Sequence, residues 1–409
     1  MTIRWITPML GTAPAAEMRG AHEYQLIDVR DLVDKAGNRS EAVGEKIKQG
    51  AESLRAGKQV VVCCDYGISR SNAIAAGILS KYQKISLGAA VHLVQETTGE
   101  TEIKLEPLNA VREALGGELS PKKTADKRTV LITGASGFVG RATCERLETE
   151  INIVAPAQSQ LDIEQGSTQL SLLVAEHDVD TIIHLANPRV FSSNVALGKT
   201  LAMLRNVLDV CENRDVPLIY PSGWEIYSGY SGSILADESV PPFPRGPYGE
   251  TKYLAEMLIE HWQRTSKLRC TILRSSPVYG AAGSKPKFIY NFIEKAKHAE
   301  PIVTHHYNNG APALDLLHID DFVEAIASSL QREYVGTLNI GTGIVTPTFA
   351  IAEMIKAGID STSEIGQTQI DATTASIAMN YQKAKQALGW QPSVTLQTGI
   401  KRILEEVLG

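Results

Sequence analysis

A glycine-rich turn constrains the fold of this chain more than any other stretch of its sequence. It reads Thr133-Gly134-Ala135-Ser136-Gly137-Phe138-Val139-Gly140, follows a short apolar strand and opens a helix. The first glycine of such a turn lets the chain reverse tightly, the second lets the backbone approach a pyrophosphate, and the third lets the helix pack on the strand. Because all three glycines stand in the strand–turn–helix context, the turn predicts a dinucleotide-binding unit.

Apolar strands and amphipathic helices alternate along the chain from this turn onward. Strands are expected at residues 128–134, 151–156, 180–186 and 217–222, and helices at 138–148, 169–177 and 201–211. Alternation of this kind is typical of a parallel sheet covered by helices on both faces. We therefore expect an α/β fold with a Rossmann-type doubly wound parallel sheet.

The chain has 409 residues, and single cores stop growing near about 250–300 residues. Residues 117–127 are polar, follow Gly116 and contain Gly117 and Pro121, so they predict a linker. The linker divides a first domain, 1–116, from a second, 128–409. Strands expected at 24–30 and 58–63 and a helix at 71–82 make the first domain α/β as well.

A second candidate site is the run Cys64-Asp65-Tyr66-Gly67-Ile68-Ser69-Arg70-Ser71, in which a strand ends at Cys64 and a helix starts at Ser71. Converging backbone N–H groups and a helix N-terminus lower a thiol pKa and bind phosphate. Arg70 can hold two phosphate oxygens, and Ser71 can donate to the thiolate or assist a second step. The run predicts a nucleophile that attacks phosphorus. A phosphate-binding module without turnover, or a structural cysteine, is the alternative.

The spacing of this run resembles the signature loop of dual-specificity phosphatases. The segments IRWITPMLGTAP and LGAAVHLVQETTG also resemble that family, so the resemblance covers about residues 1–115. It implies a phosphatase-like α/β domain with Cys64, Arg70 and Ser71 as catalytic residues. It also implies an aspartate general acid upstream, for which Asp31 fits best by position, with Asp34 and Asp28 as rivals. The family usually has histidine before the nucleophile, where this chain has Cys63.

A tyrosine and a lysine one helical turn apart form the third constellation. Tyr248 and Lys252 lie in Pro247-Tyr248-Gly249-Glu250-Thr251-Lys252, at the start of an amphipathic helix. Residues at i and i+4 share one face of a helix. An ammonium beside a phenol favours the phenolate, so we expect a lowered pKa for Tyr248 and a general acid–base role.

Tyr-x-x-x-Lys combined with the glycine turn resembles the short-chain dehydrogenases. The segments that resemble their extended epimerase/dehydratase branch are His184-Leu185-Ala186, Ile272-Leu273-Arg274, Pro277-Val278-Tyr279-Gly280, Leu317-His318-Ile319-Asp320-Asp321 and Leu388-Gly389-Trp390-Gln391-Pro392. This resemblance covers about residues 128–408. It implies a small C-terminal substrate-binding lobe and a homodimer.

The resemblance implies a third catalytic residue, a serine or threonine at a strand end, and the matching position is Gly223. Ser222, one residue earlier, is the candidate substitute. Glu225 stands where sugar dehydratases carry a glutamate that removes a proton beside the ketone, and Trp224 replaces its companion aspartate. A structural or solvated Glu225 remains the alternative.

The cofactor implied is NAD, with NADP open, because the second strand ends Ala155-Pro156-Ala157-Gln158 without an acid or an arginine. Asp162, in Leu-Asp-Ile, resembles the aspartate near the adenine of deoxysugar keto-reductases. The residues expected to bind the cofactor are Gly134, Ser136, Gly137, Phe138, Val139, Gly140, Asp162, Ile163, Leu185, Ala186, Tyr248, Lys252 and Pro277.

Three functions follow as hypotheses. The first is a bifunctional enzyme, in which an NAD(P)-dependent sugar epimerase or dehydratase works through a transient ketone and a cysteine phosphatase is fused in front. The second is an NADPH-dependent keto-sugar reductase, and the third is a non-catalytic dinucleotide-sensing scaffold. The arginine that often grips a substrate diphosphate is Leu314 here, which favours a sugar phosphate or small polyol over a nucleotide sugar.

Composition and charge limit the partners and the cellular location that we expect for this protein. The net charge of −6 and the lack of a basic tract argue against a nucleic-acid partner. The N-terminus has no apolar signal core, and no apolar run is long enough to span a bilayer, so we expect a cytoplasmic protein without a membrane partner. The five scattered cysteines predict no disulfide framework. We expect no metal.

Overall fold

The computed structural model describes every residue except 1, 117–126, 189–192, 282, 284–286 and 409. The chain divides into two compact units. The first comprises Met1–Asp126, Gln158–Val179 and Asp209–Arg214, and the second comprises Lys127–Ala157, Asp180–Leu208 and Asp215–Gly409. The expected linker, 117–127, lies outside the described residues except for Lys127. The first unit also takes in two segments that the sequence assigned to the second domain.

The first unit is built on a four-stranded sheet in the order β1-β2-β4-β3. Its strands are β1 (Arg4–Thr7), β2 (Leu10–Pro14), β3 (Gln25–Asp28) and β4 (Val60–Cys64). β4 lies between β2 and β3 and is parallel to both, whereas β1 is antiparallel to β2. All five residues of β4 are buried, so the strand that ends at Cys64 is the rigid centre of this sheet.

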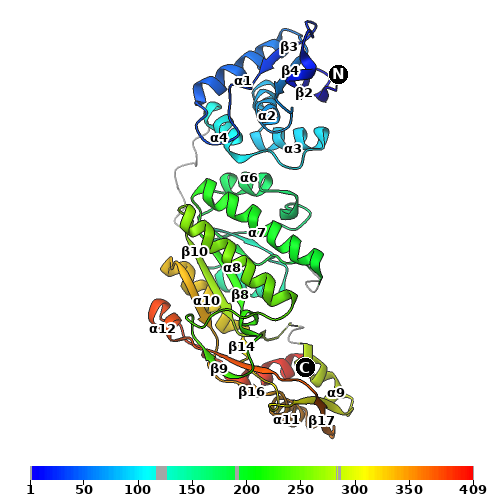
Figure 1. Cartoon of the computed structure of the whole chain (residues 1–409), viewed down its shortest axis with the longest axis vertical. Helices are drawn as coiled ribbons and strands as arrows, with labels where there is room; N and C mark the ends of the chain where they lie inside the picture. Colours follow the sequence, from blue (N-terminus) through cyan, green and yellow to red (C-terminus); the bar gives the residue numbers. More distant parts are fainter. Residues whose placement is uncertain (1, 117–126, 189–192, 282, 284–286, 409) are drawn as a thin grey trace. The chain divides into compact units, whose positions relative to one another are not determined.

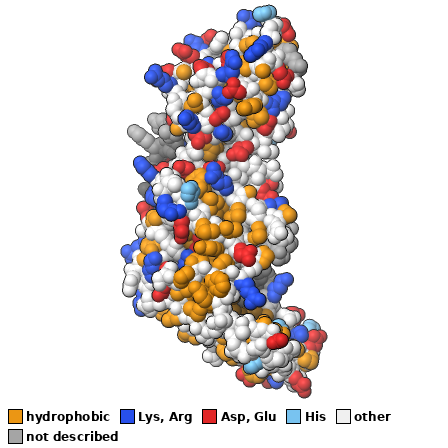
Figure 2. Space-filling model, viewed as in Figure 1, with side chains coloured by type: hydrophobic (Ala, Val, Ile, Leu, Met, Phe, Trp, Pro, Cys, Tyr) orange, Lys and Arg blue, Asp and Glu red, His pale blue; other side chains and the backbone are white. Residues whose placement is uncertain are grey.

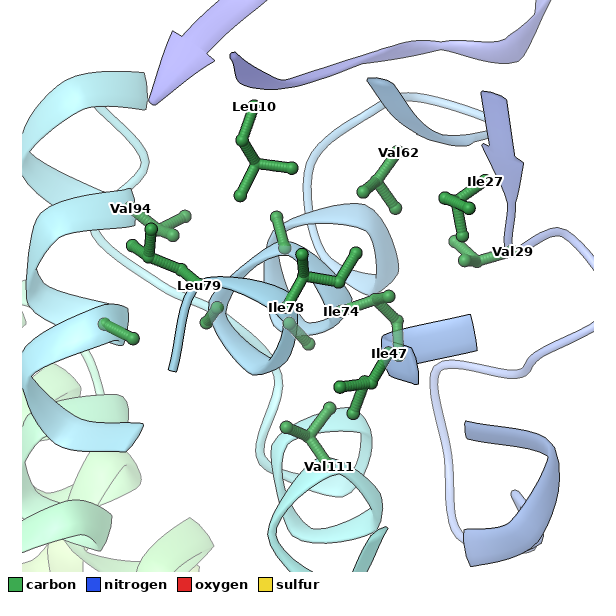
Figure 3. Packing of buried hydrophobic residues seen from close by; sticks show 14 of the residues in the cluster. Leu10, Ile27, Val29, Ile47, Val62, Ile74, Ile78, Leu79, Val94 and Val111 are labelled. Atoms are coloured by element: carbon green, nitrogen blue, oxygen red, sulfur yellow. The ribbon is translucent and has the colours of Figure 1, made fainter. Parts of the chain in front are cut away.

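Helices cover one face of this sheet (Figure 1). They are α1 (Ser40–Arg55), α2 (Arg70–Gln83), α3 (Leu87–Thr98) and α4 (Leu105–Ala114). Val62 packs with Ile47, Ile74 and Ile78 of α1 and α2 in one apolar cluster (Figure 3). Val61 belongs to a separate cluster on the other face, with Met18 of the 3₁₀ turn Ala15–Met18. The unit also contains the 3₁₀ turn Ile163–Gln165 and α6 (Thr168–Glu176).

The second unit contains a six-stranded sheet in the order β15-β10-β8-β7-β5-β6. Its strands are β5 (Thr129–Thr133), β6 (Asn152–Val154), β7 (Thr181–His184), β8 (Leu218–Gly223), β10 (Cys270–Ser275) and β15 (Gly336–Ile340). Every pairing is parallel. The chain passes from β5 outward to β6 and returns on the other side of β5 at β7. In open α/β sheets, ligands bind beyond the carboxyl ends of the strands at such a switch point.

The two faces of this sheet carry different helices. Ile219 of β8 packs in the apolar cluster that contains Phe322 of α10 (Ile319–Arg332) and Leu388 of α12 (Gln382–Leu388). The next residue, Tyr220, lies 4.9 Å (ring centroid) from Nζ of Lys252 in α8 (Pro247–Thr265). Because successive strand residues point to opposite faces, α10 and α8 cover opposite faces. The other helices that follow these strands are α5 (Phe138–Leu147) and α7 (Asn194–Arg214).

Short strands and three helices form a smaller lobe within the second unit. Its helices are α9 (Lys287–Lys297), α11 (Thr348–Ile359) and α13 (Leu396–Leu408), and they enclose one apolar cluster. The strand pairs are β11 (Val278–Tyr279) with β14 (Leu317–His318), β12 (Ile302–Tyr307) with β17 (Ile365–Ile370), β13 (Ala313–Leu314) with β16 (Thr346–Pro347), and β9 (Gly232–Ala236) with β18 (Ala375–Met379). In the described part of the chain, no helix is both long and apolar enough to cross a membrane.

A buried carboxylate joins three segments of this unit. Asp315 is fully buried and accepts hydrogen bonds from the backbone N–H groups of Thr342, Gly343 and Met379 at 2.9, 3.0 and 2.9 Å. We predict that Asp315→Ala lowers the free energy of unfolding of the second unit by about 2–4 kcal/mol, because it leaves several buried N–H donors without an acceptor. Urea unfolding followed by tryptophan fluorescence measures the change, since three of the four tryptophans lie in this unit: Trp224, Trp262 and Trp390.

The matched control for this prediction is Asp320→Ala. The Asp320 side chain is 60% exposed and pairs with Arg402 at the surface. Exposed pairs of this kind contribute about 0–1 kcal/mol. Equal loss of stability in the two variants would contradict the role given to Asp315.

Candidate active site

The Cys64 loop closes over the sulfur of its own cysteine. The backbone N–H of Gly67 donates to Sγ of Cys64 at 3.2 Å, and Oγ of Ser71 lies 3.4 Å from Sγ. Gly67 has φ +68°, and a Cβ added there would lie 2.5 Å from the backbone of Ala13. Glycine is therefore required at this position by both conformation and space. The loop holds its N–H groups directed at the sulfur.

The two neighbouring cysteines of β4 differ in acidity. Burial raises the pKa of Cys64, but hydrogen bonds from Ser71 and from the backbone N–H groups of Ile68 and Tyr66 outweigh it, so the pKa lies below its ordinary value. Burial raises the pKa of Cys63 to about 11. Of the two cysteines, Cys64 is thus the one that forms a thiolate more readily. Cys63 stands where a histidine was expected.

Arg70 is held beside this sulfur by the loop that follows β3. Its Nη1 donates to the carbonyl oxygen of Leu32 at 2.8 Å, its Nη2 to Asp65 at 2.6 Å, and its Nε lies 3.2 Å from Oδ2 of Asp34. Cys64, Arg70 and Ser71 therefore come together as expected. Their arrangement can bind a tetrahedral oxyanion in front of a thiolate.

The structure directs the upstream aspartates differently from the sequence expectation. Asp31 points away to Nζ of Lys46 on α1 at 2.9 Å, and its side chain is 62% exposed. Asp28 pairs with Arg30. Asp34, which was only a rival by position, is the carboxylate that reaches Arg70. Two hydrogen bonds between Val33 and Asn38, both at 2.8 Å, close the loop that contains Asp34.

The glycine turn lies at the switch point of the six-stranded sheet. A Cβ at Gly140 would lie 2.3 Å from the carbonyl oxygen of Gly134, and a Cβ at Gly134 would lie 2.7 Å from the backbone N of Ala186. Gly134 also has φ +70°. The loops after β5 and β7 are thus in direct contact, as a ligand crevice between two parallel strands requires.

Side chains at the ends of β5 and β7 fix this contact. Oγ1 of Thr133 lies 2.8 Å from Nδ1 of His184 and accepts hydrogen bonds from the backbone N–H groups of Leu185 and Ala186, both at 3.2 Å. Burial, together with the charge of Lys252, lowers the pKa of His184 to about 3, so its imidazole is neutral. Ser136 and Gly137 are exposed, whereas Phe138 and Val139 are partly buried.

The other expected cofactor residues have local structural roles. Asp162 caps the 3₁₀ turn that begins at Ile163 by accepting from the N–H of Glu164 at 3.1 Å. Pro277 precedes β11, and its carbonyl oxygen accepts from the N–H of Leu317 at 3.0 Å. These contacts do not bear on the cofactor roles expected of the three residues.

The Tyr248–Lys252 pair lies at the start of α8, whose first residue is Pro247. Lys252 is buried, and its Nζ donates to the carbonyl oxygen of Pro221 at 2.9 Å. Nζ also lies 4.9 Å from the ring centroid of Tyr220 and 5.8 Å from that of Tyr248. Burial lowers the pKa of Lys252 to about 8, despite the nearby carboxylates of Glu225 and Glu256.

The acidity of Tyr248 differs from the sequence expectation of a lowered pKa. Burial raises the pKa of Tyr248, and the negative charge of Glu225 raises it further. The Lys252 ammonium, 5.8 Å from the ring centroid of Tyr248, does not reverse this direction.

Glu225 lies in the 3₁₀ turn Trp224–Tyr227, directly after β8. A Cβ at Gly223 would lie 2.3 Å from Oε2 of Glu225, so the carboxylate fills the space that a side chain at 223 would occupy. A Cβ at Gly249 would lie 2.5 Å from the carbonyl oxygen of Glu225, so this turn is in contact with the start of α8. Ser222 is buried, and among the described residues its Oγ has no hydrogen-bond partner.

Sequence reasoning missed the group that holds this turn in place. Glu256 of α8 is buried and binds the guanidinium of Arg274 at 2.7 Å, and Nη1 of Arg274 donates to the hydroxyl of Tyr227 at 2.7 Å. The sequence did contain an indication of this pair, because Glu256 follows Lys252 by one helical turn and so lies on the same face of the helix. An acid on the buried face of an amphipathic helix requires a buried partner.

Tyr248, Thr251 and Lys252 of α8 line a small pocket of about 10 Å³. Asn187, from the loop after β7, and Thr200 of α7 line the same pocket. Asn187 follows Ala186, the residue in contact with Gly134. The glycine turn and the Tyr–Lys pair therefore belong to one site. In the described part of the chain, no group of three or more His, Cys, Asp or Glu side chains could hold a metal ion.

Residues 130–341 match the family model described as the NAD dependent epimerase/dehydratase family. The chain is 28% identical over 304 residues to a putative UDP-glucose 4-epimerase of Methanocaldococcus jannaschii, a match that covers 67% of this chain and 97% of that protein. It is 27% identical to the dTDP-4-dehydro-6-deoxyglucose reductase of Escherichia coli, over 69% of this chain and 98% of that protein.

Solved structures share the fold. The UDP-glucose 4-epimerase of Thermus thermophilus, in complex with NAD, superposes with a TM-score of 0.61 at 20% identity, over 69% of this chain and 99% of that one. The residues present here fit that cofactor. The absent side chains at Gly134 and Gly140 bring two backbone loops together at a helix N-terminus, which is where a pyrophosphate binds. NAD is the cofactor.

The family match covers the glycine turn, Glu225, Tyr248 and Lys252, begins after the Cys64 loop and extends over more than half of the sequence. The chain belongs to the NAD-dependent epimerase/dehydratase family.

Proposed function

We propose that this protein is a sugar epimerase or dehydratase that oxidises a carbinol of its substrate to a transient ketone. The observation that carries the proposal is the shared pocket, in which Tyr248 and Lys252 face the loop that contacts the glycine turn. When bound, NAD accepts a hydride from the carbinol carbon and returns it. The residues of the chain bind and orient the sugar and move its hydroxyl proton.

Lys252 and Tyr248 have distinct parts in this chemistry. The pKa of Lys252, about 8, makes it a cation at neutral pH, and this charge is lost as the pH rises through 8. As a buried cation it stabilises negative charge that develops on the substrate oxygen. Tyr248 is the proton carrier in contact with that oxygen.

Two observations bear on the substrate: the names of the relatives, and Leu314 at the position where an arginine was expected. The relatives named above act on UDP-glucose and on a dTDP-sugar by their names, which favours a nucleotide sugar. Leu314 packs against the apolar cluster of the small lobe, so this position supplies no cation for a diphosphate. A sugar phosphate therefore remains in the proposal. The E. coli relative supports net keto-sugar reduction as a second candidate function.

For the first unit we propose hydrolysis of a phosphate monoester at Cys64. The thiolate attacks phosphorus and the ester P–O bond breaks, while Asp34 gives a proton to the leaving oxygen. Water then cleaves the S–P bond and releases phosphate. The N–H groups around Sγ and the guanidinium of Arg70 bind the phosphoryl oxygens throughout.

We also propose that the protein is a homodimer. Helix α8 exposes Leu254 and Met257, and apolar side chains gather in the middle of the face drawn in Figure 2. Exposed apolar patches on a folded unit favour association. The mass of the protein in solution, from light scattering, tests this proposal.

We predict that Tyr248→Phe reduces sugar-dependent turnover by about 10²–10⁴-fold, because it removes the proton carrier. The measurement is the absorbance of reduced NAD and the analysis of products, with UDP-glucose, UDP-glucuronic acid, dTDP-glucose and glucose 1-phosphate as trial substrates. Tyr253→Phe is the matched control on the same helix.

The pattern of products separates the hypotheses. Epimerised or dehydrated sugar without net redox change supports the proposal, and stoichiometric consumption of NADH or NADPH supports the reductase. NAD binding without turnover of any trial sugar would leave the dinucleotide-sensing scaffold as the function. Unchanged turnover in Tyr248→Phe would contradict the mechanism.

For the Cys64 loop we predict that Cys64→Ser and Asp34→Asn reduce hydrolysis of p-nitrophenyl phosphate by at least about 10²-fold. Asp31→Asn and Cys63→Ala are the controls and should stay within about twofold, because neither side chain takes part in the step. A large loss in Asp31→Asn with none in Asp34→Asn would reverse the assignment of the general acid.

Alkylation separates binding from turnover at this loop. Because the pKa of Cys64 is lowered, iodoacetamide should modify it at a pH below that of an ordinary thiol, and Ser71→Ala should shift the modification to higher pH. Inorganic phosphate should protect Cys64. Protection without hydrolysis would support a phosphate-binding module in place of an enzyme.

A further inference from the structure

The guanidinium of Arg70 is bound by a carboxylate of its own loop. Nη2 of Arg70 donates to Oδ2 of Asp65 at 2.6 Å, and Asp65 directly follows Cys64 in the chain. The side chain of Arg70 is 11% exposed, whereas that of Asp65 is 54% exposed. Asp65 therefore approaches the guanidinium from the solvent side, at the opening of the Cys64 loop.

The remaining donors of Arg70 are turned toward the protein. Nη1 donates to the carbonyl oxygen of Leu32 at 2.8 Å, and Nε lies 3.2 Å from Oδ2 of Asp34. A phosphoryl group that binds this guanidinium through two oxygens needs Nη2 and so displaces Asp65. In the proposed hydrolysis Asp34 gives a proton to the leaving oxygen, and Asp65 has no part in that step. The displaced carboxylate then lies beside the part of the substrate that projects from the loop.

Large apolar side chains surround the same opening. Four such side chains are exposed in the described part of the first unit, and three of them lie in the loops after β3 and β4. These three are Val33, Tyr66 and Ile68, which are 39%, 77% and 39% exposed, and the fourth is Tyr82 near the end of α2. The backbone N–H groups of Tyr66 and Ile68 bond to the Cys64 sulfur, so their exposed side chains flank the nucleophile.

The loop that carries Tyr66 and Ile68 is fixed between them. Nη2 of Arg4 donates to the carbonyl oxygen of Gly67, and Nη1 of Arg4 binds Glu100 at 2.5 Å. Because the middle of the loop is held, the two side chains on either side of Gly67 are presented at the surface in a defined place. A surface of this kind can contact an apolar group attached to the phosphate.

We propose that the Cys64 site takes phosphate monoesters whose remaining part is apolar and carries no further negative charge. Tyr66 and Ile68 pack against this part, and Asp65 repels esters in which it is anionic. The inference rests on the proposed hydrolysis of phosphate monoesters. Its physical basis is that apolar surface is stabilised by leaving water, whereas like charges close together in a partly buried site repel each other.

The first test compares kcat/KM of the full chain for phenyl phosphate and 4-carboxyphenyl phosphate at pH 7. The carboxyl group adds a charge and makes the phenol at least as good a leaving group, so the chemical step alone predicts no loss. We expect the wild type to prefer phenyl phosphate by about 5–20-fold. Asp65→Asn keeps the shape and removes the charge, and it should reduce this preference to about twofold or less. High salt should also weaken the preference, because it screens exposed charges.

The second test adds 2-naphthyl phosphate, whose larger ring extends the apolar surface without a charge. We expect the wild type to prefer it over phenyl phosphate by about 3–10-fold, and Tyr66→Ser to remove most of that preference. Tyr82→Ser, at the other end of α2, and Glu52→Gln, an exposed acid of α1, are the matched controls. Glu52 lies toward the end of α1 where Arg55 donates to the carbonyl oxygen of Lys81, so both controls should leave the preferences unchanged.

A third measurement needs no hydrolysis. Iodoacetate is close to iodoacetamide in shape but carries a negative charge. We expect Asp65→Asn to speed the alkylation of Cys64 by iodoacetate about 3–10-fold relative to iodoacetamide, because the carboxylate at the opening no longer repels the anion. Cys64→Ser gives the background from the other four cysteines. An unchanged ratio in Asp65→Asn would overturn the role of Asp65.

The outcomes separate this inference from the function on which it rests. A wild type that hydrolyses none of the three esters contradicts the proposed hydrolysis and the substrate class with it. An active wild type that does not distinguish phenyl phosphate from 4-carboxyphenyl phosphate leaves the hydrolysis intact and overturns only the inference. Equal loss on all three esters in Asp65→Asn would do the same and make Asp65 a positioning residue for Arg70. So would a preference for 4-carboxyphenyl phosphate that disappears in Lys35→Gln, since Lys35 is an exposed cation in the loop after β3.

Discussion

The site of the second unit depends on one buried ion pair. Glu256 and Arg274 are almost completely excluded from solvent, with side chains 1% and 6% exposed. Pairs of this kind add little net stability, but removal of one partner costs about 3–5 kcal/mol because it leaves a buried charge uncompensated. The pair joins α8 to β10, and through the hydroxyl of Tyr227 it also fixes the turn after β8. The pair therefore fixes the turn after β8 against α8 and β10.

That arrangement explains why the polar groups of the site can differ from the expected set. Gly223 stands where a hydroxyl was expected, and the end of the Glu225 side chain lies where a side chain at 223 would point. A larger residue at 223 would require this flexible carboxylate to move aside, because its Oε2 lies 2.3 Å from the Cβ position. The strand end in this structure therefore presents a carboxylate in place of a hydroxyl.

Local sequence was sufficient wherever function depends on backbone geometry within a few residues. The glycine turn and the Cys64 loop were both predictable, because strand, turn and helix N-terminus follow each other directly. The ion pairs of Asp31 and Asp34 were not predictable, because they depend on how a loop folds against Lys46 and Arg70. The raised pKa of Tyr248 was not predictable either, since burial is a property of tertiary packing.

The loops after β4 and β5 share one backbone arrangement but carry different side chains. In each, a buried parallel strand delivers the chain to a glycine with positive φ, and a helix begins within a few residues. Both therefore have the backbone geometry that can place N–H groups around an anion. The loop after β4 also has the Cys64 thiol, whose pKa is lowered, and the guanidinium of Arg70, which is held by hydrogen bonds. The loop after β5 has exposed Ser136 and Gly137 at its tip and adds no ionisable side chain there, so its chemistry is limited to what backbone N–H groups and a hydroxyl can do.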